Sequence, residues 1–447
     1  MARLNRLTNK EILFIGFMLF SILFGAGNLI FPAYLGQAAG ENVWAAIIGF
    51  IISDAGLAVL AFIAIAKSGT FESLLNRVHP VFAFLFPIVI YLSIGPGLAI
   101  PRAGSLAYEM GVKPFLPNVI GSSPLALLVY TVVFFSIVFW FAKSPSKLID
   151  RIGKVLTPTL LVLMIVIFIK ALFTDMAQFK EAALAYKENP ISQGFLDGYQ
   201  TMDALCPLIY GVLFTTIFRN KNITKPSLQV NYLVRFGLIS GLLLSICYLI
   251  IAYLGASASI TGKVDNGAIV LSVVLQQLFG TSGTVVLGVI FTLACLSVCI
   301  GLITSCAQFF SSLFQKLSYI QWAILLCVIS GLVANLGLSQ ILKISVPILG
   351  LLYPMVIALI ILGLAHDRLP FHQRPVYVMT IGLVGLYSLV EVINSQWLHG
   401  SLSVLLSNVP LQNMGFGWVI PGLLGFTIGC LVEKYKSTTE TMEKKAA

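Results

Sequence analysis

Apolar runs of about 20 residues recur along the chain as far as Val432. A helical run of this length spans the hydrocarbon core of a bilayer, because a helix rises about 1.5 Å per residue. Hydrophobic residues make up 58% of the 447 residues and charged residues only 10%, and no polar segment is long enough to form a water-soluble domain. The chain is therefore predicted to be an all-α polytopic membrane protein.

Hydropathy over a window of about 20 residues predicts about twelve transmembrane helices. The predicted ranges are 11–36, 42–66, 80–101, 124–143, 149–172, 193–218, 228–254, 284–313, 319–337, 340–364, 374–395 and 416–432. Most of the 27 Lys and Arg residues fall on segments that face the cytoplasm if the N-terminus does, as the positive-inside rule requires. Both termini, including the tail 433–447, are therefore expected in the cytoplasm, and Arg102 is assigned to an outer helix end.

The net charge of +10 is then a property of membrane orientation, and no nucleic-acid partner is expected. All seven cysteines fall inside predicted spans, which gives no support to a disulfide framework. Each of the four histidines lies in a loop or at a span end, and no pair of histidines, or of a cysteine with a histidine, has metal-ligand spacing. Cys295, Cys299 and Cys306 share a helical face, where small packing residues are expected in preference to a metal site. The sequence therefore offers no convergent nucleophile, base or metal cluster, and we expect neither an enzyme nor a bound cofactor.

A glycine-rich break interrupts the first apolar run. Gly25, Ala26, Gly27 and Asn28 lie a little past its middle, and Pro32 follows. Within hydrocarbon every backbone N–H and C=O needs a partner, so a helix is broken only where the freed groups meet protein, water or ligand. The break is a candidate binding site, and close helix packing by small residues is the alternative.

A second break lies in the sixth span, where residues 198–207 carry an amide, a hydroxyl, a carboxylate and a proline. Each break opens a set of five spans, so the two sets have opposite orientations in the membrane. We predict inverted repeats at 11–173 and 193–364, two additional helices at 374–432, and a single membrane transport domain over 1–447. Broken helices in corresponding positions of inverted halves indicate a carrier with its site near the bilayer midplane.

The ends of the broken helices suit a zwitterion and a cation. Half-helix N-termini present N–H groups and a partial positive charge, which favour a carboxylate. Half-helix C-termini present carbonyls, which favour Na⁺ or an ammonium group. A channel would be expected to repeat a pore loop or a ring of like charges, and the sequence shows neither.

Four strings carry a family resemblance: Phe-Gly-Ala-Gly-Asn-Leu-Ile-Phe-Pro at 24–32, Ile-Gly-Pro-Gly-Leu-Ala-Ile-Pro-Arg at 94–102, Gly-Tyr-Gln-Thr-Met-Asp at 198–203 and Gly-Leu-Ile-Thr at 301–304. They resemble the branched-chain amino acid:cation symporters, the BrnQ-like or LIVCS carriers, over essentially the whole chain. The resemblance implies Na⁺-driven uptake of leucine, isoleucine and valine across a bacterial inner membrane. It also implies twelve spans and a fold similar to the leucine transporter.

The resemblance also implies a substrate site and an ion site. The substrate carboxylate is expected at the N–H groups of the first break, and the amine at carbonyls of both breaks, which gives the set Leu23, Gly25, Ala26, Gly27, Tyr199, Gln200, Thr201 and Met202. The Na⁺ site is expected to use Ser21, Phe24, Ala294 and Ser297, with Asn28 and Asp203 as further ion contacts. The sequence departs from the family fold's usual pattern, because Val298 stands where a second hydroxyl residue is expected. Either a ligand is missing or Thr292, Thr304 or Ser305 compensates.

Three acidic residues within the spans bear on the coupling ion. Asp54, Asp197 and Asp203 are each costly in lipid unless paired or facing water. Asp203 caps the inner half-helix, coordinates a cation or carries a proton. For Asp54 we expect a structural hydrogen bond to a neighbouring helix. The alternative function is therefore a proton-coupled or exchanging amino-acid carrier of the same fold.

An apolar cavity must select the side chain of the substrate. Gly95, Pro96 and Gly97 remove bulk from the third span, either for this cavity or for helix packing. The expected walls are Leu98, Ile100, Leu205 and Ile209. One methylene in such a pocket is worth only about 1–3 kcal/mol, so leucine, isoleucine and valine should be poorly separated from one another.

Overall fold

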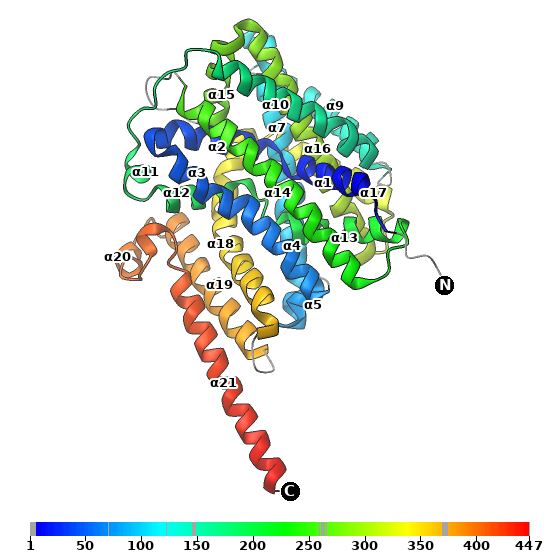
Figure 1. Cartoon of the computed structure of the whole chain (residues 1–447), viewed down its shortest axis with the longest axis vertical. Helices are drawn as coiled ribbons and strands as arrows, with labels where there is room; N and C mark the ends of the chain where they lie inside the picture. Colours follow the sequence, from blue (N-terminus) through cyan, green and yellow to red (C-terminus); the bar gives the residue numbers. More distant parts are fainter. Residues whose placement is uncertain are drawn as a thin grey trace. The chain divides into compact units, whose positions relative to one another are not determined.

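The computed structural model describes residues 6–69, 71–121, 123–144, 149–258, 260, 264, 266–368 and 374–446. These residues form helices and turns without any strand (Figure 1). Eight helical stretches among them are long and apolar enough to cross a membrane, and the bent pair Pro190–Gly211 with Leu213–Asn220 would make a ninth. The prediction of an all-α polytopic membrane protein is confirmed, and the number of crossings and the inverted repeat stay predictions.

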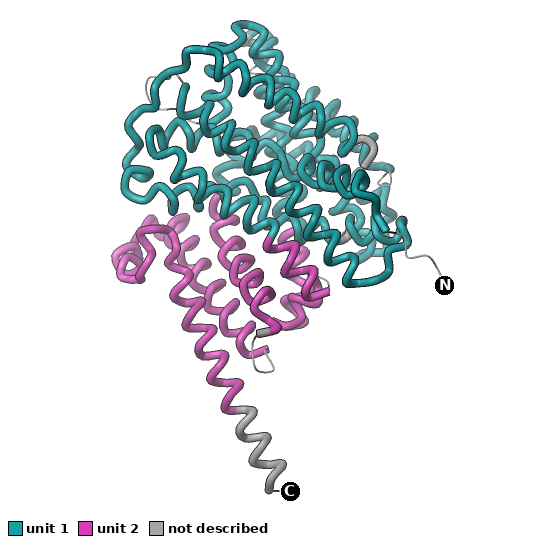
Figure 2. Tube along the Cα trace, viewed as in Figure 1, with its two compact units in different colours: residues 1–59, 91–345 teal, residues 60–90, 346–447 magenta. Residues whose placement is uncertain are grey.

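Each of the twelve predicted ranges overlaps helical residues, and several contain two or three helices separated by breaks. The chain divides into two compact units, Met1–Val59 with Tyr91–Ser345 and Leu60–Ile90 with Val346–Ala447 (Figure 2). The helices that lie entirely in the first unit are α1 Asn9–Leu23, α2 Ala26–Ala39, α3 Val43–Ile51, α7 Ala99–Gly111, α8 Asn118–Gly121, α9 Pro124–Ala142, α10 Thr157–Leu172, α11 Leu184–Glu188, α12 Pro190–Gly198, α13 Cys206–Asn220, α14 Pro226–Ala256, α15 Gly267–Phe279, α16 Thr281–Leu313 and α17 Tyr319–Ala334.

The second unit contains α5 Phe71–Asn76, α19 Arg374–Gln396, α20 Ser403–Leu406 and α21 Val419–Ala446. Three helices have residues in both units: α4 Leu57–Ser68, α6 Pro80–Leu92 and α18 Leu338–Ala365. Short 3₁₀ turns lie at Gly40–Asn42, Lys113–Phe115, Tyr199–Thr201, His366–Arg368 and Gln412–Met414. Wider π-helical turns lie at Ile52–Gly56, Ser93–Gly97 and Ile149–Leu156.

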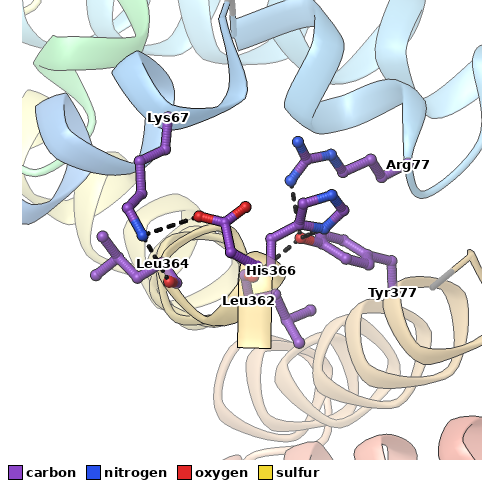
Figure 3. Close-up of polar contacts among 7 residues, drawn as sticks. Lys67, Arg77, Leu362, Leu364, His366 and Tyr377 are labelled. Carbon is purple, nitrogen blue, oxygen red and sulfur yellow. Dashed lines mark hydrogen bonds and ion pairs between the residues drawn. The ribbon is translucent and has the colours of Figure 1, made fainter. Parts of the chain in front are cut away.

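Polar contacts within the second unit join the ends of its helices (Figure 3). Lys67, at the end of α4, lies 3.2 Å from the Asp367 carboxylate in the 3₁₀ turn after α18. The Tyr377 hydroxyl of α19 donates to the Leu362 carbonyl at 2.9 Å and accepts from Arg77 at 3.3 Å. Lys67 also donates to the Leu364 carbonyl at 3.4 Å. Side chains thus satisfy two carbonyls near the end of α18 that have no partner within the helix.

Close helix packing in the first unit depends on glycine. A side chain at Gly49 of α3 would meet the backbone of Ile191, and one at Gly194 of α12 would meet the backbone of Ala46. Small residues let two backbones approach where no side chain fits between them. The close approach fixes α12, the helix before the second break, against α3, which leads into the turn that carries Asp54.

Candidate functional site

The first break lies between α1 and α2. Helix α1 ends at Leu23, Phe24 and Gly25 are non-helical, and α2 begins at Ala26. The break is therefore shorter than predicted, because Ala26 to Asn28 already form the first turn of α2. The Asn28 side chain stabilises this start by accepting the Gly25 N–H at 2.9 Å. The first N–H groups of α2 have no partner within their helix and carry its positive end.

The second break follows α12. The 3₁₀ turn Tyr199–Thr201 continues from Gly198, and Met202 then adopts φ 74°, a left-handed backbone that an L-residue rarely takes. Helix α13 begins at Cys206 without a side-chain cap, so of the three alternatives for Asp203 the structure does not support capping of the inner half-helix. The left-handed residue turns the chain, which leaves the carbonyls at the end of the 3₁₀ turn without continuing helix partners.

Hydrogen bonds between buried side chains link the two breaks. Asn28 Nδ2 donates to Asp203 Oδ2 at 2.7 Å and to the Tyr248 hydroxyl of α14 at 2.5 Å. The Thr201 hydroxyl donates to Asp54 Oδ1 at 2.8 Å, which confirms the expected bond between Asp54 and a neighbouring helix. Asn28 therefore stabilises the start of α2 through Gly25 and also contacts the second break through Asp203.

Arg102 lies inside this site, so its assignment to an outer helix end is wrong. The apolar helical stretch runs from Pro80 to Phe115, beyond the predicted end at 101, and this places Arg102 in the first turn of α7. Its side chain is buried with 3% exposed. Nη1 donates to the Gln200 carbonyl at 2.8 Å and Nη2 to the Thr201 carbonyl at 3.4 Å. A buried arginine is stabilised by such carbonyls.

A small cavity lies between the two breaks. Its volume is about 20 Å³, which is room for about one water. Arg102, Asp203 and main-chain or side-chain atoms of both breaks contact it. The lining residues are Ile22, Leu23, Gly25, Ala26, Gly27, Asn28, Ile94, Ala99, Arg102, Ala103, Thr201, Met202, Asp203, Cys206, Val298 and Leu302.

The cavity includes most of the predicted substrate-binding residues but none of the predicted walls. Six of the eight predicted residues line it; Gln200 contributes a carbonyl to Arg102, and the Tyr199 ring packs edge-on against Phe195. The expected walls Leu98, Ile100, Leu205 and Ile209 do not line it. A space of this size does not hold the substrate's side chain, so these walls stay a prediction.

Helix phase explains the difference in the walls. Residues three and four apart share one face of a helix, so Ala99, Arg102 and Ala103 of α7 face the cavity together. Leu98 and Ile100 then fall on other faces. At Gly95 a side chain would lie 2.8 Å from the Cys306 sulfur of α16, which favours the packing role for this glycine.

The six predicted ion-binding residues form two hydrogen-bonded groups and one separate residue. Ser297 Oγ lies 2.8 Å from the Ser21 carbonyl and 2.9 Å from the Ala294 carbonyl, which gathers three oxygens at one point. Asn28 and Asp203 belong to the network described above. The Phe24 N–H donates to Phe20 at the end of α1.

Val298, which stands where a second hydroxyl residue is expected, lines the cavity. Thr292 packs against Gly111 of α7. Thr304 and Ser305 are fully buried, and their hydroxyls have no hydrogen-bond partner among the described residues. Asp197, the remaining acidic residue of the sixth span, accepts from Tyr186 at 2.6 Å and from Gln193 at 3.1 Å.

Sequence reasoning missed two residues of the site. Arg102 was visible as a charged residue directly after an apolar string, and the continuing apolar run to Phe115 could have placed it inside a helix. Tyr248 gave no such signal, because it stands in a long apolar run like many other aromatic residues. Only the fold brings its hydroxyl to Asn28.

The chain is similar in sequence to known proteins over most of its length. A family model described as "Branched-chain amino acid transport protein" matches residues 8–436. The branched-chain amino acid permease BraB of Bacillus subtilis is 43% identical over 424 residues, which are 94% of this chain and 95% of that protein.

Two solved structures are similar in fold at low sequence identity. Mhp1, a nucleobase-cation-symport-1 family transporter in a closed conformation with bromovinylhydantoin bound, has a TM-score of 0.62 and 12% identity and covers 98% of this chain and 96% of its own. MhsT in complex with L-phenylalanine has a TM-score of 0.52 and 19% identity and covers 86% of this chain and 98% of its own. The likeness confirms the predicted fold class.

Proposed function

We propose, because the chain belongs to the branched-chain amino acid transport protein family, that it imports leucine, isoleucine and valine together with Na⁺ by alternating access. The observation that carries the proposal is the pair of broken helices, whose opposite end groups and buried polar side chains surround one cavity. In this account the protein is a multi-pass carrier of a bacterial inner membrane with both termini in the cytoplasm, and its chemistry is binding and release.

The two breaks offer complementary groups to an amino acid. The N–H groups of Ala26 and Gly27 stand at the positive end of α2, where a carboxylate is stabilised. The carbonyls of Gln200 and Thr201 accept hydrogen bonds from a guanidinium, so they also suit an ammonium group. The apolar contacts around the cavity, including Ile94 of the third span, would receive the branched side chain.

For Na⁺ we propose the oxygens gathered by Ser297. Sodium takes several oxygen ligands, and here the Ser21 and Ala294 carbonyls each lie within 2.9 Å of the Ser297 hydroxyl. When the ion binds, the Ser297 hydroxyl would turn its lone pair toward it and release the Ser21 carbonyl. Ser305 stands eight residues beyond Ser297 on α16, about 12 Å along the helix axis, so its hydroxyl is too far away to complete this site.

Proton coupling is the second candidate, and a charge imbalance favours it. Asp54 and Asp203 are 0% and 2% exposed, and Arg102 is the buried cation that contacts the same break. Two buried carboxylates with one buried arginine leave one negative charge to be balanced, because an unpaired charge is costly in a low-dielectric interior. A proton shared by the carboxylates would balance it as well as a metal cation.

Leucine accumulation in proteoliposomes distinguishes the two candidates. With an inward Na⁺ gradient at equal pH, leucine should accumulate inside; a tenfold gradient supplies about 1.4 kcal/mol, enough for about a tenfold leucine gradient at one Na⁺ per leucine. Ser297→Ala should raise the Na⁺ concentration required for leucine uptake. Ser311→Ala, which changes a partly buried serine near the end of α16, should leave that concentration unchanged. Accumulation driven by a pH gradient without Na⁺ would overturn the sodium version, and leucine exchange without accumulation would favour the exchanger.

A further inference from the structure

The Arg102 guanidinium occupies the position expected for the substrate ammonium. It donates to the Gln200 and Thr201 carbonyls at the end of the 3₁₀ turn, and these are the acceptors that the bound amine would use. The guanidinium carbon also lies 5.5 Å from the centre of the Phe31 ring, at a distance typical of a cation–π contact. A cation that belongs to the protein therefore already binds the negative half of the site.

Arg102 also reaches the positive half of the site. A Cβ built on Gly27 would lie 2.8 Å from Nη2, so the guanidinium is close to the first turn of α2. The N-terminus of a helix repels a cation and attracts an anion. The carbonyls of the second break must therefore hold the guanidinium in place, and a carboxylate arriving between it and α2 would be attracted by both.

The remaining cavity is too small for an amino acid while Arg102 lies there. Its 20 Å³ is about the space of a single water. Leucine can enter only if surrounding side chains move, and Arg102 is the longest of the side chains that line the cavity. The guanidinium's contact with the carbonyls and the bound substrate thus exclude one another, so the guanidinium must leave as leucine binds.

We infer that Arg102 is a tethered cation that substitutes for the substrate ammonium in the empty carrier. It satisfies the carbonyls of the second break when no substrate is bound, and it leaves them when leucine arrives. The inference rests on the proposed function, since it concerns the same site. Its consequence is kinetic: the empty carrier can close over a satisfied site and return across the membrane to accept another substrate.

Net uptake and exchange depend differently on this step. Net uptake requires the empty carrier to return, whereas exchange of internal for external leucine uses only loaded states. Without the guanidinium, closure of the empty carrier would bury carbonyls that have no partner, which is strongly disfavoured. Removing the tethered cation also removes a competitor for the ammonium position, which raises the fraction of carrier ready to bind.

The test compares net uptake and exchange of radiolabelled leucine in proteoliposomes containing Arg102→Gln, Arg102→Lys and wild-type protein. We expect the ratio of net uptake to exchange to fall at least about tenfold in Arg102→Gln, and to stay within about threefold of wild type in Arg102→Lys, which keeps a cation. Leucine should bind purified Arg102→Gln at least about threefold more tightly. Lys113→Gln removes an exposed cation paired with Glu109 just after α7 and should leave the ratio unchanged.

Two results would overturn the inference. If net uptake and exchange fall in parallel in Arg102→Gln and leucine binds it more weakly, Arg102 binds the substrate and does not substitute for it. If Arg102→Lys, eluting as a single species in detergent, loses net uptake selectively, positive charge is not what the step requires. Failure of the proposed function can be distinguished from failure of this inference, because in that case the wild-type protein would show neither leucine exchange nor leucine accumulation.

Discussion

Gly27→Val is expected to abolish leucine binding while the protein remains folded. At this position even a Cβ would lie 2.8 Å from Arg102 Nη2 and 3.3 Å from the Thr201 Cα, so the two branches of valine would fill the space between the breaks. Displacing reacting or binding groups by about 1 Å costs on the order of 100-fold, and here the ligand position itself is blocked. Leucine affinity should therefore fall at least about 100-fold, as measured by titration of the purified protein.

The matched control is Gly211→Val on α13. Gly211 is also a helical glycine of the first unit, and nothing lies within 4 Å of a Cβ built there. It carries the same cost in helix propensity without entering the cavity, so leucine affinity should stay near the wild-type value. Unchanged leucine affinity in Gly27→Val would remove the first break from the binding site.

Asn28→Asp is the second substitution with a large expected effect. The amide nitrogen of Asn28 donates to both Asp203 and Tyr248, and a carboxylate has no donor to replace it. The new charge would also face Asp203 in a buried position. A buried charge left without its partner costs about 3–5 kcal/mol, which is about 100- to 4,000-fold. Initial rates of leucine uptake should fall by at least about 100-fold.

Asn335→Asp provides the control for this substitution. Asn335 is a partly buried asparagine of the same unit, whose amide donates to Thr131 and to the Gly331 carbonyl at one end of α17. The change is chemically identical but lies outside the two breaks, so uptake should be reduced far less. Equal losses in the two variants would mean that the link between α2 and Asp203 has no special role in transport.

The sequence was sufficient to locate the two breaks. In a membrane span, helix-breaking residues must have compensating partners, so Gly25 and the segment from Tyr199 onward were visible without a structure. The residues at which each break begins and ends could not be predicted from the sequence. The Asn28 side chain closes the first break three residues earlier than predicted, and Met202 ends the second half-helix through a left-handed backbone.

The cavity walls and the buried charges depended on information that a linear pattern does not contain. Whether Leu98 or Ala99 faces the cavity depends on the rotation of α7 after the turn at Gly95, which is non-helical. Arg102 lay one residue beyond a predicted span, and a window average has no sharp end. Tyr248 and Asp203 are 45 positions apart in the sequence, and Asn28 connects them only because α2, α14 and the second break meet.

The most direct test of the account is an experimental structure of the protein with leucine bound. We predict that the leucine carboxylate lies at the N–H groups of Ala26 and Gly27, that its ammonium group contacts the carbonyls of Gln200 and Thr201, and that Arg102 has left those carbonyls. Leucine bound away from both breaks, in a structure where Arg102 still contacts Gln200, would contradict the account.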